Sequence, residues 1–205
     1  MTAADDRGLP LEPFLYLSAR AADVAGLHAA AVARQRETVV VACGAHAGGG
    51  DIVLDRWRDG DLERAADLLH ESYTIDSGDC FAPHGEHEEW LRYVTVLVED
   101  TQCGTLDPML TRVLRDAERL RALALVTSVS PTLVHVAQLA VHPDWRREGL
   151  ATWLLADVAA EAAATGREQI TLLVRGSNRG ARRLYAALGF TPQGMGAHYD
   201  TLLTT

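Results

Sequence analysis

The most informative stretch of this 205-residue chain is Leu139-Ala140-Val141-His142-Pro143-Asp144-Trp145-Arg146-Arg147-Glu148-Gly149-Leu150-Ala151. It closes the apolar run Leu133–Val141, which predicts a strand buried on both faces. A turn that contains Pro143 follows. Apolar residues at helical spacing predict a long helix over Trp145–Gly166, and the turn favours a helix start near Gly149. A strand that passes through a tight turn into a helix can present the start of that helix to a ligand.

The turn itself predicts an anion-binding site. The first amides of a helix have no partner within the helix and lie at the positive end of its dipole. Gly149 and the small Ala151 let a phosphate group approach the backbone, and Arg146 and Arg147 add positive charge. The alternative is a solvent-exposed loop before a helix that merely starts at a glycine. A dinucleotide-binding turn is disfavoured, because the chain contains no G-x-G-x-x-G sequence.

A second patterned segment, ITLLVRGSNRGARRLYAALGF, begins at residue 170. It predicts a buried strand over Gln169–Val174 and a helix over Arg179–Leu188. Asn178 is a natural N-cap for this helix, and Gly189 is a natural left-handed C-cap before another strand.

The rest of the chain predicts strands that alternate with helices, which is typical of an α/β or α+β sheet protein. Strands are expected over Ile52–Trp57, Met109–Leu114, Leu123–Val129 and from Phe190 onward, and helices over Leu62–Tyr73 and Glu86–Val98. Before a glycine-rich joint at residues 45–50, a strand, a helix and a strand are expected over Pro13–Leu17, Ala21–Arg36 and Thr38–Ala42. We therefore divide the chain into an N-terminal extension, residues 1–50, and a domain of residues 51–205.

The composition excludes several classes of function. The chain has 19 arginines and no lysine, which rules out Schiff-base chemistry, a lysine-bound pyridoxal phosphate and a Walker A lysine. Its formal charge of -9 disfavours nucleic-acid binding, which needs a clustered basic surface.

The cysteines and the apolar segments predict where the protein resides and whether it binds a metal ion. Three cysteines, Cys43, Cys80 and Cys103, stand at unrelated spacings, which favours reduced thiols and a cytoplasmic location. No stretch approaches the length of a membrane span and no signal segment is recognised, so membrane association is not expected. Cys80, His84 and His87 would need a fourth ligand to bind zinc, and no metal is expected.

Together the two patterned segments resemble the GCN5-related N-acetyltransferase (GNAT) superfamily. The resemblance rests on Arg146-x-x-Gly149-x-Ala151 and on Asn178-x-x-Ala181-x-x-Leu184-Tyr185-x-x-Leu188-Gly189-Phe190, in this order and each preceded by a strand. It covers residues 132–190 best and residues 51–130 more loosely. It implies a mixed central sheet flanked by helices, in which two parallel strands splay apart and acetyl-CoA binds in the gap between them.

The resemblance also implies which residues bind acetyl-CoA. Backbone groups of Leu139, Ala140 and Val141 would pair with the pantetheine arm like an added strand. The pyrophosphate would rest on the amides of Arg146, Arg147, Glu148, Gly149, Leu150, Ala151 and Thr152. Asn178 would hydrogen-bond near the pantetheine or the reacting centre, and Tyr185 matches the position that in many members protonates the departing thiolate.

The general base departs from the family's pattern. Members often carry a glutamate on the strand before the Arg–Gly turn, but Leu133–Val141 has no carboxylate. His135 lies six residues before Val141, where some members carry their base, and a neutral imidazole suits that role. The alternative is a core histidine that bonds to the backbone. Gln138 can orient a water molecule but cannot accept the proton.

We therefore expect an N-acetyltransferase that moves an acetyl group from acetyl-CoA to a primary amine, with Tyr185 as the general acid. The alternative is a non-catalytic module that binds acyl-CoA as a sensor or scaffold. The missing strand carboxylate favours this alternative, whereas Tyr185 and Asn178 favour the enzyme. The acceptor is expected to be a small molecule that the sequence does not identify, and a homodimer is left open.

Overall fold

A mixed sheet of eight strands forms the centre of the computed structural model, which describes residues 14–26, 52–73, 81–99, 103–116 and 119–195. The strands lie in the spatial order β2-β4-β5-β6-β7-β1-β8, and β3 pairs with β5. Their bounds are β1 Phe14–Arg20, β2 Val53–Arg56, β3 Thr105–Leu106, β4 Arg112–Arg115, β5 Leu120–Ser128, β6 Leu133–Val141, β7 Gln169–Arg175 and β8 Thr191–Met195. Only β6 and β7 pair in parallel among the described strands. The mixed sheet expected from the sequence is confirmed.

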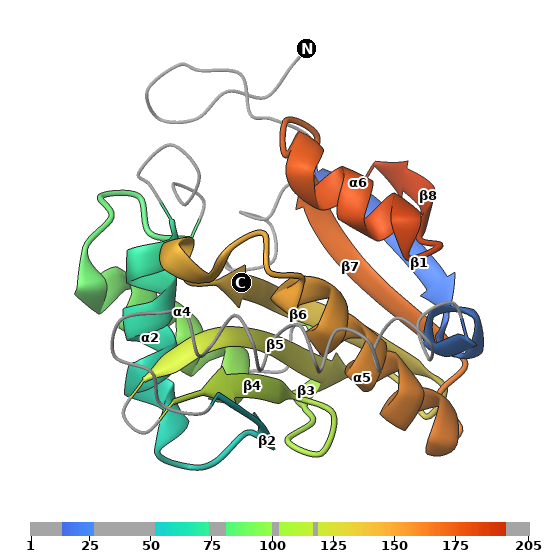
Figure 1. Ribbon diagram of the computed structural model, residues 1–205, viewed down its shortest axis with the longest axis horizontal. Helices are drawn as coiled ribbons and strands as arrows, with labels where there is room; N and C mark the ends of the chain where they lie inside the picture. Colours follow the sequence, from blue (N-terminus) through green and yellow to red (C-terminus); the bar gives the residue numbers. More distant parts are fainter. Residues whose placement is uncertain (1–13, 27–51, 74–80, 100–102, 117–118, 196–205) are drawn as a thin grey trace.

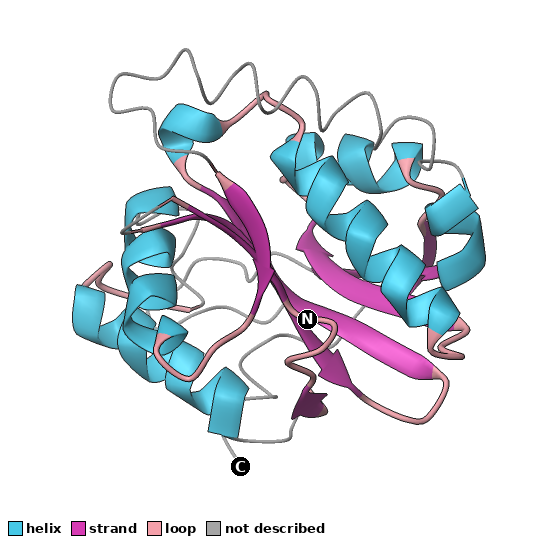
Figure 2. Ribbon diagram, turned by 60° about the horizontal axis from the view of Figure 1, so that its bottom comes forward, coloured by secondary structure: helices cyan, strands magenta, loops and turns pink. Residues whose placement is uncertain are grey.

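Helices cover both faces of this sheet (Figures 1 and 2). The bounds of the longer helices are α2 Asp61–Ser72, α4 His87–Glu99, α5 Leu150–Ala164 and α6 Arg179–Ala187. Apolar residues of α5 and α6 share one core with β1, and those of α2 and α4 share a second core with β5. The central strand β6 contributes to both, with Val134 and Val136 in the first core and Ala137 and Ala140 in the second. This double burial explains its continuous apolar sequence.

Of the two starts predicted for the long helix, Trp145 is wrong and Gly149, the N-cap of α5, is confirmed. Trp145 ends a short 3₁₀ turn that begins at Pro143, and α5 starts only at Leu150. Between them, Arg147 and Gly149 have positive φ angles of 72° and 78°. Such angles lie outside the right-handed helical region, so the chain turns here before the helix can begin.

The predicted strand Met109–Leu114 also starts too early. The Asp107 carboxylate accepts hydrogen bonds from the amides of Met109 and Leu110, both at 3.1 Å, and closes a turn. Met109 is therefore 53% exposed, and β4 begins at Arg112.

The strand β1 lies within the sheet, hydrogen-bonded to β7 on one side and to β8 on the other. Phe14, Leu17 and Ala19 are buried, so the first strand of the predicted extension packs on the strands and helices that follow it in the chain. Residues 21–26 are helical, while the rest of the helix predicted to Arg36, the strand predicted over Thr38–Ala42 and the domain boundary at residue 50 lie outside the described residues. The sheet thus joins β1 to the strands beyond that boundary.

Candidate active site

The gap between β6 and β7 is where the sheet opens. These strands pair only along Leu133–Val136 and Gln169–Leu172. A bulge then interrupts β6, because Ala137 is inserted between the residues that pair with Leu125 and Val126 of β5. Beyond the bulge β6 continues beside β5, while β7 continues beside β1, and Figure 1 shows the two strands diverging. The splayed parallel strands expected from the resemblance are confirmed.

The far end of β6 has backbone groups that can pair with an extended molecule. Leu139, Ala140 and Val141 pair with β5 on one side only. In an antiparallel pair, alternate residues direct their N–H and C=O groups away from the partner strand. The His142 amide donates to the Arg121 carbonyl of β5 at 2.9 Å, so alternation directs Ala140 toward β5 and Leu139 and Val141 toward the gap. The Val141 carbonyl also accepts a hydrogen bond from Arg146 Nε at 3.2 Å.

A row of backbone amides stands at the start of α5, beside the gap. Within the described part of the chain, no acceptor is recorded for the consecutive amides from Arg147 to Thr152. The first amide that is satisfied in the helix belongs to Trp153, which donates to the Gly149 carbonyl at 3.0 Å. The positive φ angles of Arg147 and Gly149 curl the turn, an arrangement that forms anion-binding concavities. The amide row thus has several donors without an intramolecular acceptor among the described residues, at the place where the sequence predicts an anion site.

Arg146 is placed differently from its neighbours. Its amide donates to the Pro143 carbonyl at 3.2 Å, so the row of available amides begins one residue later than expected. Its guanidinium group donates to the backbone carbonyl of Ser72 at the end of α2 as well as to that of Val141. His142, in the same loop, lies 3.1 Å from the Glu71 carboxylate. These contacts hold the loop of the amide row against the end of α2, and Arg146 connects the two through its side chain.

Arginines add positive charge at this end of the molecule. Arg147 precedes α5, and Arg179, Arg182 and Arg183 lie on the first turns of α6. All four are exposed, and none forms an ion pair with a carboxylate of the described residues. Both helices follow the carboxyl ends of parallel strands, so their first turns lie at the same edge of the sheet. A chain of net charge -9 thus has exposed arginines at this edge of the sheet.

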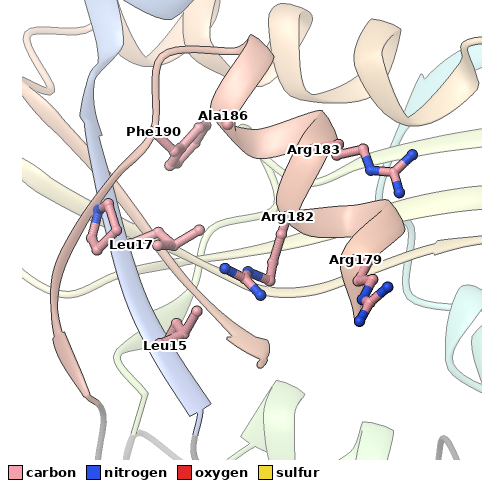
Figure 3. A pocket seen from close by; sticks show the side chains of 8 residues that line it. Leu15, Leu17, Arg179, Arg182, Arg183, Ala186 and Phe190 are labelled. Atoms are coloured by element: carbon pink, nitrogen blue, oxygen red, sulfur yellow. The ribbon is translucent and has the colours of Figure 1, made fainter. Parts of the chain in front are cut away.

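The side of α6 that meets β1 and β8 holds a cavity of about 410 Å³ (Figure 3). Its lining consists of Leu15, Leu17, Arg179, Arg182, Arg183, Ala186, Phe190 and Pro192. No residue of β6 or α5 contributes, so this cavity is separate from the gap. At the start of α6, the Asn178 side chain accepts a hydrogen bond from the Ala181 amide at 3.0 Å, which confirms its role as an N-cap.

Tyr185 of α6 is a buried side chain, 7% exposed, whose ring lies 5.8 Å from that of Phe190. Burial, together with the neighbouring phenol of Tyr73, raises the pKa of Tyr185 above its ordinary value. The hydroxyl group is therefore protonated at neutral pH, which is the state that a proton donor requires.

His135 lies in the paired part of β6, before the bulge, and is 8% exposed. Its Nδ1 is 3.0 Å from Thr171 Oγ1, and that hydroxyl group in turn donates to the Val134 carbonyl at 3.2 Å. Burial lowers the pKa of His135 to about 4, so the imidazole is neutral at pH 7 and weakly basic. The geometry favours a core histidine, satisfied by a threonine hydroxyl group.

Sequence reasoning missed Tyr73, which lies directly after α2. Its hydroxyl group accepts a hydrogen bond of 3.1 Å from Gln138 Nε2, just beyond the bulge of β6. Tyr73 also contributes, after burial, to the raised pKa of Tyr185. The only signal in the sequence was an aromatic residue at the end of a predicted helix, which does not reveal a partner on another element.

The described residues include neither a cluster of metal-ligating side chains nor a membrane-spanning helix. No group of three or more His, Cys, Asp or Glu side chains there is arranged to hold a metal ion. Among the same residues, no helix has the length and hydropathy needed to cross a membrane.

The chain belongs to the acetyltransferase (GNAT) family, whose sequence model matches residues 62–190. The matched range includes α2, the splayed strands, the amide row and Tyr185. Members of this family are acetyltransferases and typically use acetyl-CoA. No curated protein matches the chain in sequence.

Solved structures share the fold. The chain is similar to a GCN5-related N-acetyltransferase from Sphaerobacter thermophilus, with a TM-score of 0.55 and 17% identity over 89% of this chain and 49% of that protein. It is also similar to PH1933 from Pyrococcus horikoshii, with a TM-score of 0.58 and 14% identity over 72% of this chain and 94% of that protein. A third similar structure is the ribosomal-protein-S18-alanine N-acetyltransferase from Escherichia coli, with a TM-score of 0.52 and 20% identity over 68% of this chain and 77% of that protein. The chain thus spans about half the length of the Sphaerobacter protein.

Proposed function

We propose that the chain is an N-acetyltransferase that transfers an acetyl group from acetyl-CoA to a primary amine, with Tyr185 as the general acid. The amide row from Arg147 to Thr152, at the mouth of the gap between β6 and β7, carries this proposal. A diphosphate needs several donors at one place, and consecutive amides at a helix start provide them.

The residues present fit acetyl-CoA. The amide row and Arg147 would hold the pyrophosphate, and the exposed arginines at the start of α6 suit a further phosphate group. Leu139 and Val141 would pair with the amide-containing pantetheine arm, because the side of β6 that faces β7 is unpaired there. Asn178 caps α6 with its side-chain oxygen, and its amide nitrogen remains available as a donor.

The proposed reaction is direct attack of the amine nitrogen on the thioester carbonyl. A C–N bond forms, the C–S bond breaks, and the departing sulfur takes the proton of the Tyr185 hydroxyl group. The proton that the attacking amine loses restores the phenol, so charge balances over one turnover. Burial keeps Tyr185 protonated until the sulfur departs, and holding the two reactants together supplies much of the acceleration.

The test compares two glycines, each of which is the N-cap of a helix. Gly149 has a φ of 78° beside the amide row, whereas Gly60 precedes α2 with a φ of -87° and no atom within 4 Å of an added Cβ. A side chain at Gly149 strains the turn, so Gly149→Ala should weaken acetyl-CoA binding about tenfold. Gly60→Ala should leave the affinity unchanged. Isothermal calorimetry measures both, and equal affinities for the two variants would contradict the proposed phosphate site.

Turnover separates the enzyme from the acyl-CoA-binding module. The absence of a carboxylate on β6 favours the module, since no strong base stands on the strand. An enzyme releases CoA at a rate that depends on the amine, whereas a sensor or scaffold binds acetyl-CoA and releases none. Thiol detection over a panel of primary amines therefore decides between them. A small-molecule acceptor, a cytoplasmic location and a homodimer stay predictions.

A further inference from the structure

The last turn of α2 holds both sides of the 3₁₀ turn Pro143–Trp145, which leads into the amide row. The Glu71 carboxylate lies 3.1 Å from Nε2 of His142, which directly precedes the 3₁₀ turn. The Ser72 carbonyl accepts a hydrogen bond from Arg146, which directly follows it. Because Arg146 is also the residue before the amide row, the position of the row depends on its attachment to α2.

The partners of the His142 ring assign its tautomer. The Asp144 amide donates to Nδ1 at 3.2 Å, and this hydrogen bond caps the 3₁₀ turn. A neutral imidazole has one donor and one acceptor, so a ring that accepts at Nδ1 carries its hydrogen on Nε2. That N–H therefore donates to the Glu71 carboxylate. One ring thus connects the cap of the turn to α2.

The loop needs these attachments because its backbone is strained. Arg147, the first residue of the amide row, has a φ of 72°, an angle that residues with a Cβ rarely adopt. Such a conformation persists only where the surrounding contacts outweigh its cost. His142 and Arg146 supply two of these contacts, and the Arg121 guanidinium group lies over the Trp145 ring, 5.8 Å from its centre. A row that is aligned in advance binds an anion more tightly than one that must be ordered on binding.

Glu71 has a second partner outside this loop. Its other carboxylate oxygen accepts a hydrogen bond of 3.1 Å from Arg119. The Arg119 side chain is 63% exposed, whereas that of His142 is 13% exposed. Exposed ion pairs contribute little free energy because water competes for both partners. The hydrogen bond to His142 is therefore the one that fixes the loop.

We propose that Glu71 is a positioning residue for acetyl-CoA, which acts through the Nε2–H of His142 to hold the loop in the conformation that aligns the amide row. The inference rests on the proposed binding of acetyl-CoA by that row. Glu71 itself touches the loop and not the ligand. Without its carboxylate the loop loses one of its two attachments to α2, and Arg147 can return to a negative φ that turns its amide out of the row.

Calorimetry with CoA measures the affinity without requiring turnover. Glu71→Ala should raise the Kd for CoA about tenfold, the size of effect expected for one hydrogen bond to a charged group. Glu63→Ala is the matched control, because it removes an exposed glutamate from the first turn of the same helix, and its Kd should equal that of the unaltered protein. The stoichiometry separates this effect from unfolding, since an unfolded fraction lowers the number of sites and not the affinity of the remaining ones.

Two further variants identify the hydrogen bond that matters. His142→Asn keeps an acceptor for the Asp144 amide, since asparagine is a favoured cap residue, but its side chain is too short to reach Glu71. It should also raise the Kd about tenfold, and combining it with Glu71→Ala should cost no more than either change alone. Arg119→Ala removes the other partner of Glu71 and should leave the Kd unchanged.

Nitrogen-15 NMR of the histidine rings tests the tautomer independently of any ligand. At about pH 8 His142 should carry its hydrogen on Nε2, and its signals are assigned by their absence from His142→Asn. A hydrogen on Nδ1 would overturn the inference, because Glu71 would then face a nitrogen that has nothing to donate.

The binding data have two further outcomes that refute. If the unaltered protein binds CoA and Glu71→Ala binds it equally well, or if the losses in Glu71→Ala and His142→Asn simply add, the positioning role is refuted and the proposed function stands. If the unaltered protein fails to bind CoA, the proposed function is refuted and the inference with it.

Discussion

The buried imidazole of His135 makes the free energy of unfolding depend on pH within a defined window. Its pKa is about 4 in the folded protein, against 6.5 for an ordinary histidine. Between these values the unfolded chain binds a proton that the folded chain excludes, so stability rises with pH. The stabilisation is complete above the unfolded pKa and is lost as pH falls toward the folded one. The full difference corresponds to roughly 3 kcal/mol.

Most of this loss falls within an accessible range. Between about pH 7.5 and about pH 5, the two pKa values predict a loss of about 2 kcal/mol from His135 alone. His135→Asn keeps a polar side chain for Thr171 but removes the titration, so its stability should fall by about 2 kcal/mol less than that of the unaltered protein over the same range.

The assay is urea unfolding followed by circular dichroism, at both pH values, for each protein. His70→Gln is the matched control, since it removes an exposed histidine, and its pH dependence should follow that of the unaltered protein. The quantity compared is the change in the free energy of unfolding between the two pH values. A variant that is less stable by the same amount at both values therefore still tests the prediction. Equal losses in the unaltered protein and in His135→Asn would refute the reasoning and return His135 to the candidates for the general base.

Three further outcomes are expected. Tyr185→Phe removes the proposed acid and should lower kcat about 100-fold with little change in acetyl-CoA affinity; unchanged turnover in a chemistry-limited assay would remove Tyr185 from that role. Leu17→Ala should lower the free energy of unfolding by about 2–5 kcal/mol in a urea titration, because Leu17 is 5% exposed in the core that β1 completes; a smaller loss would mean that β1 contributes little. Asp61→Asn should cost about 3 kcal/mol in the same assay, since the buried Asp61 carboxylate accepts two hydrogen bonds of 2.8 Å from Arg115; a near-neutral result would show that Arg115 finds another partner.

Local patterns in the sequence were sufficient for most of the elements. The apolar run Leu133–Val141 became β6 without change of bounds, and Asn178 caps α6 as predicted. These features depend on neighbours in the chain, such as an N-cap side chain that bonds an amide three residues on. The helix start near Gly149 was also predicted, but the positive φ of Arg147 was not, because arginine rarely adopts such a φ angle.

Local sequence patterns did not predict the contacts between segments that are distant in the chain. Tyr73 meets Gln138 across 65 positions of the chain, and no pattern around either residue pairs them. Arg146 was expected to bind an anion with its amide and to add positive charge. Its amide donates instead to the Pro143 carbonyl, and its side chain donates to the carbonyl of Ser72. The environment of His135 likewise depends on Thr171, which faces it from the neighbouring strand.

Local sequence was enough to predict the strand–turn–helix that presents the amide row and the capped helix that carries Tyr185, because hydrogen bonds and side-chain spacing within short segments specify such units. The position of β1 between β7 and β8, and the hydrogen bond between Tyr73 and Gln138 of β6, followed only from the assembled fold. Strand partners and ring contacts are chosen by burying apolar surface from many elements together, and that free energy depends on all of them at once.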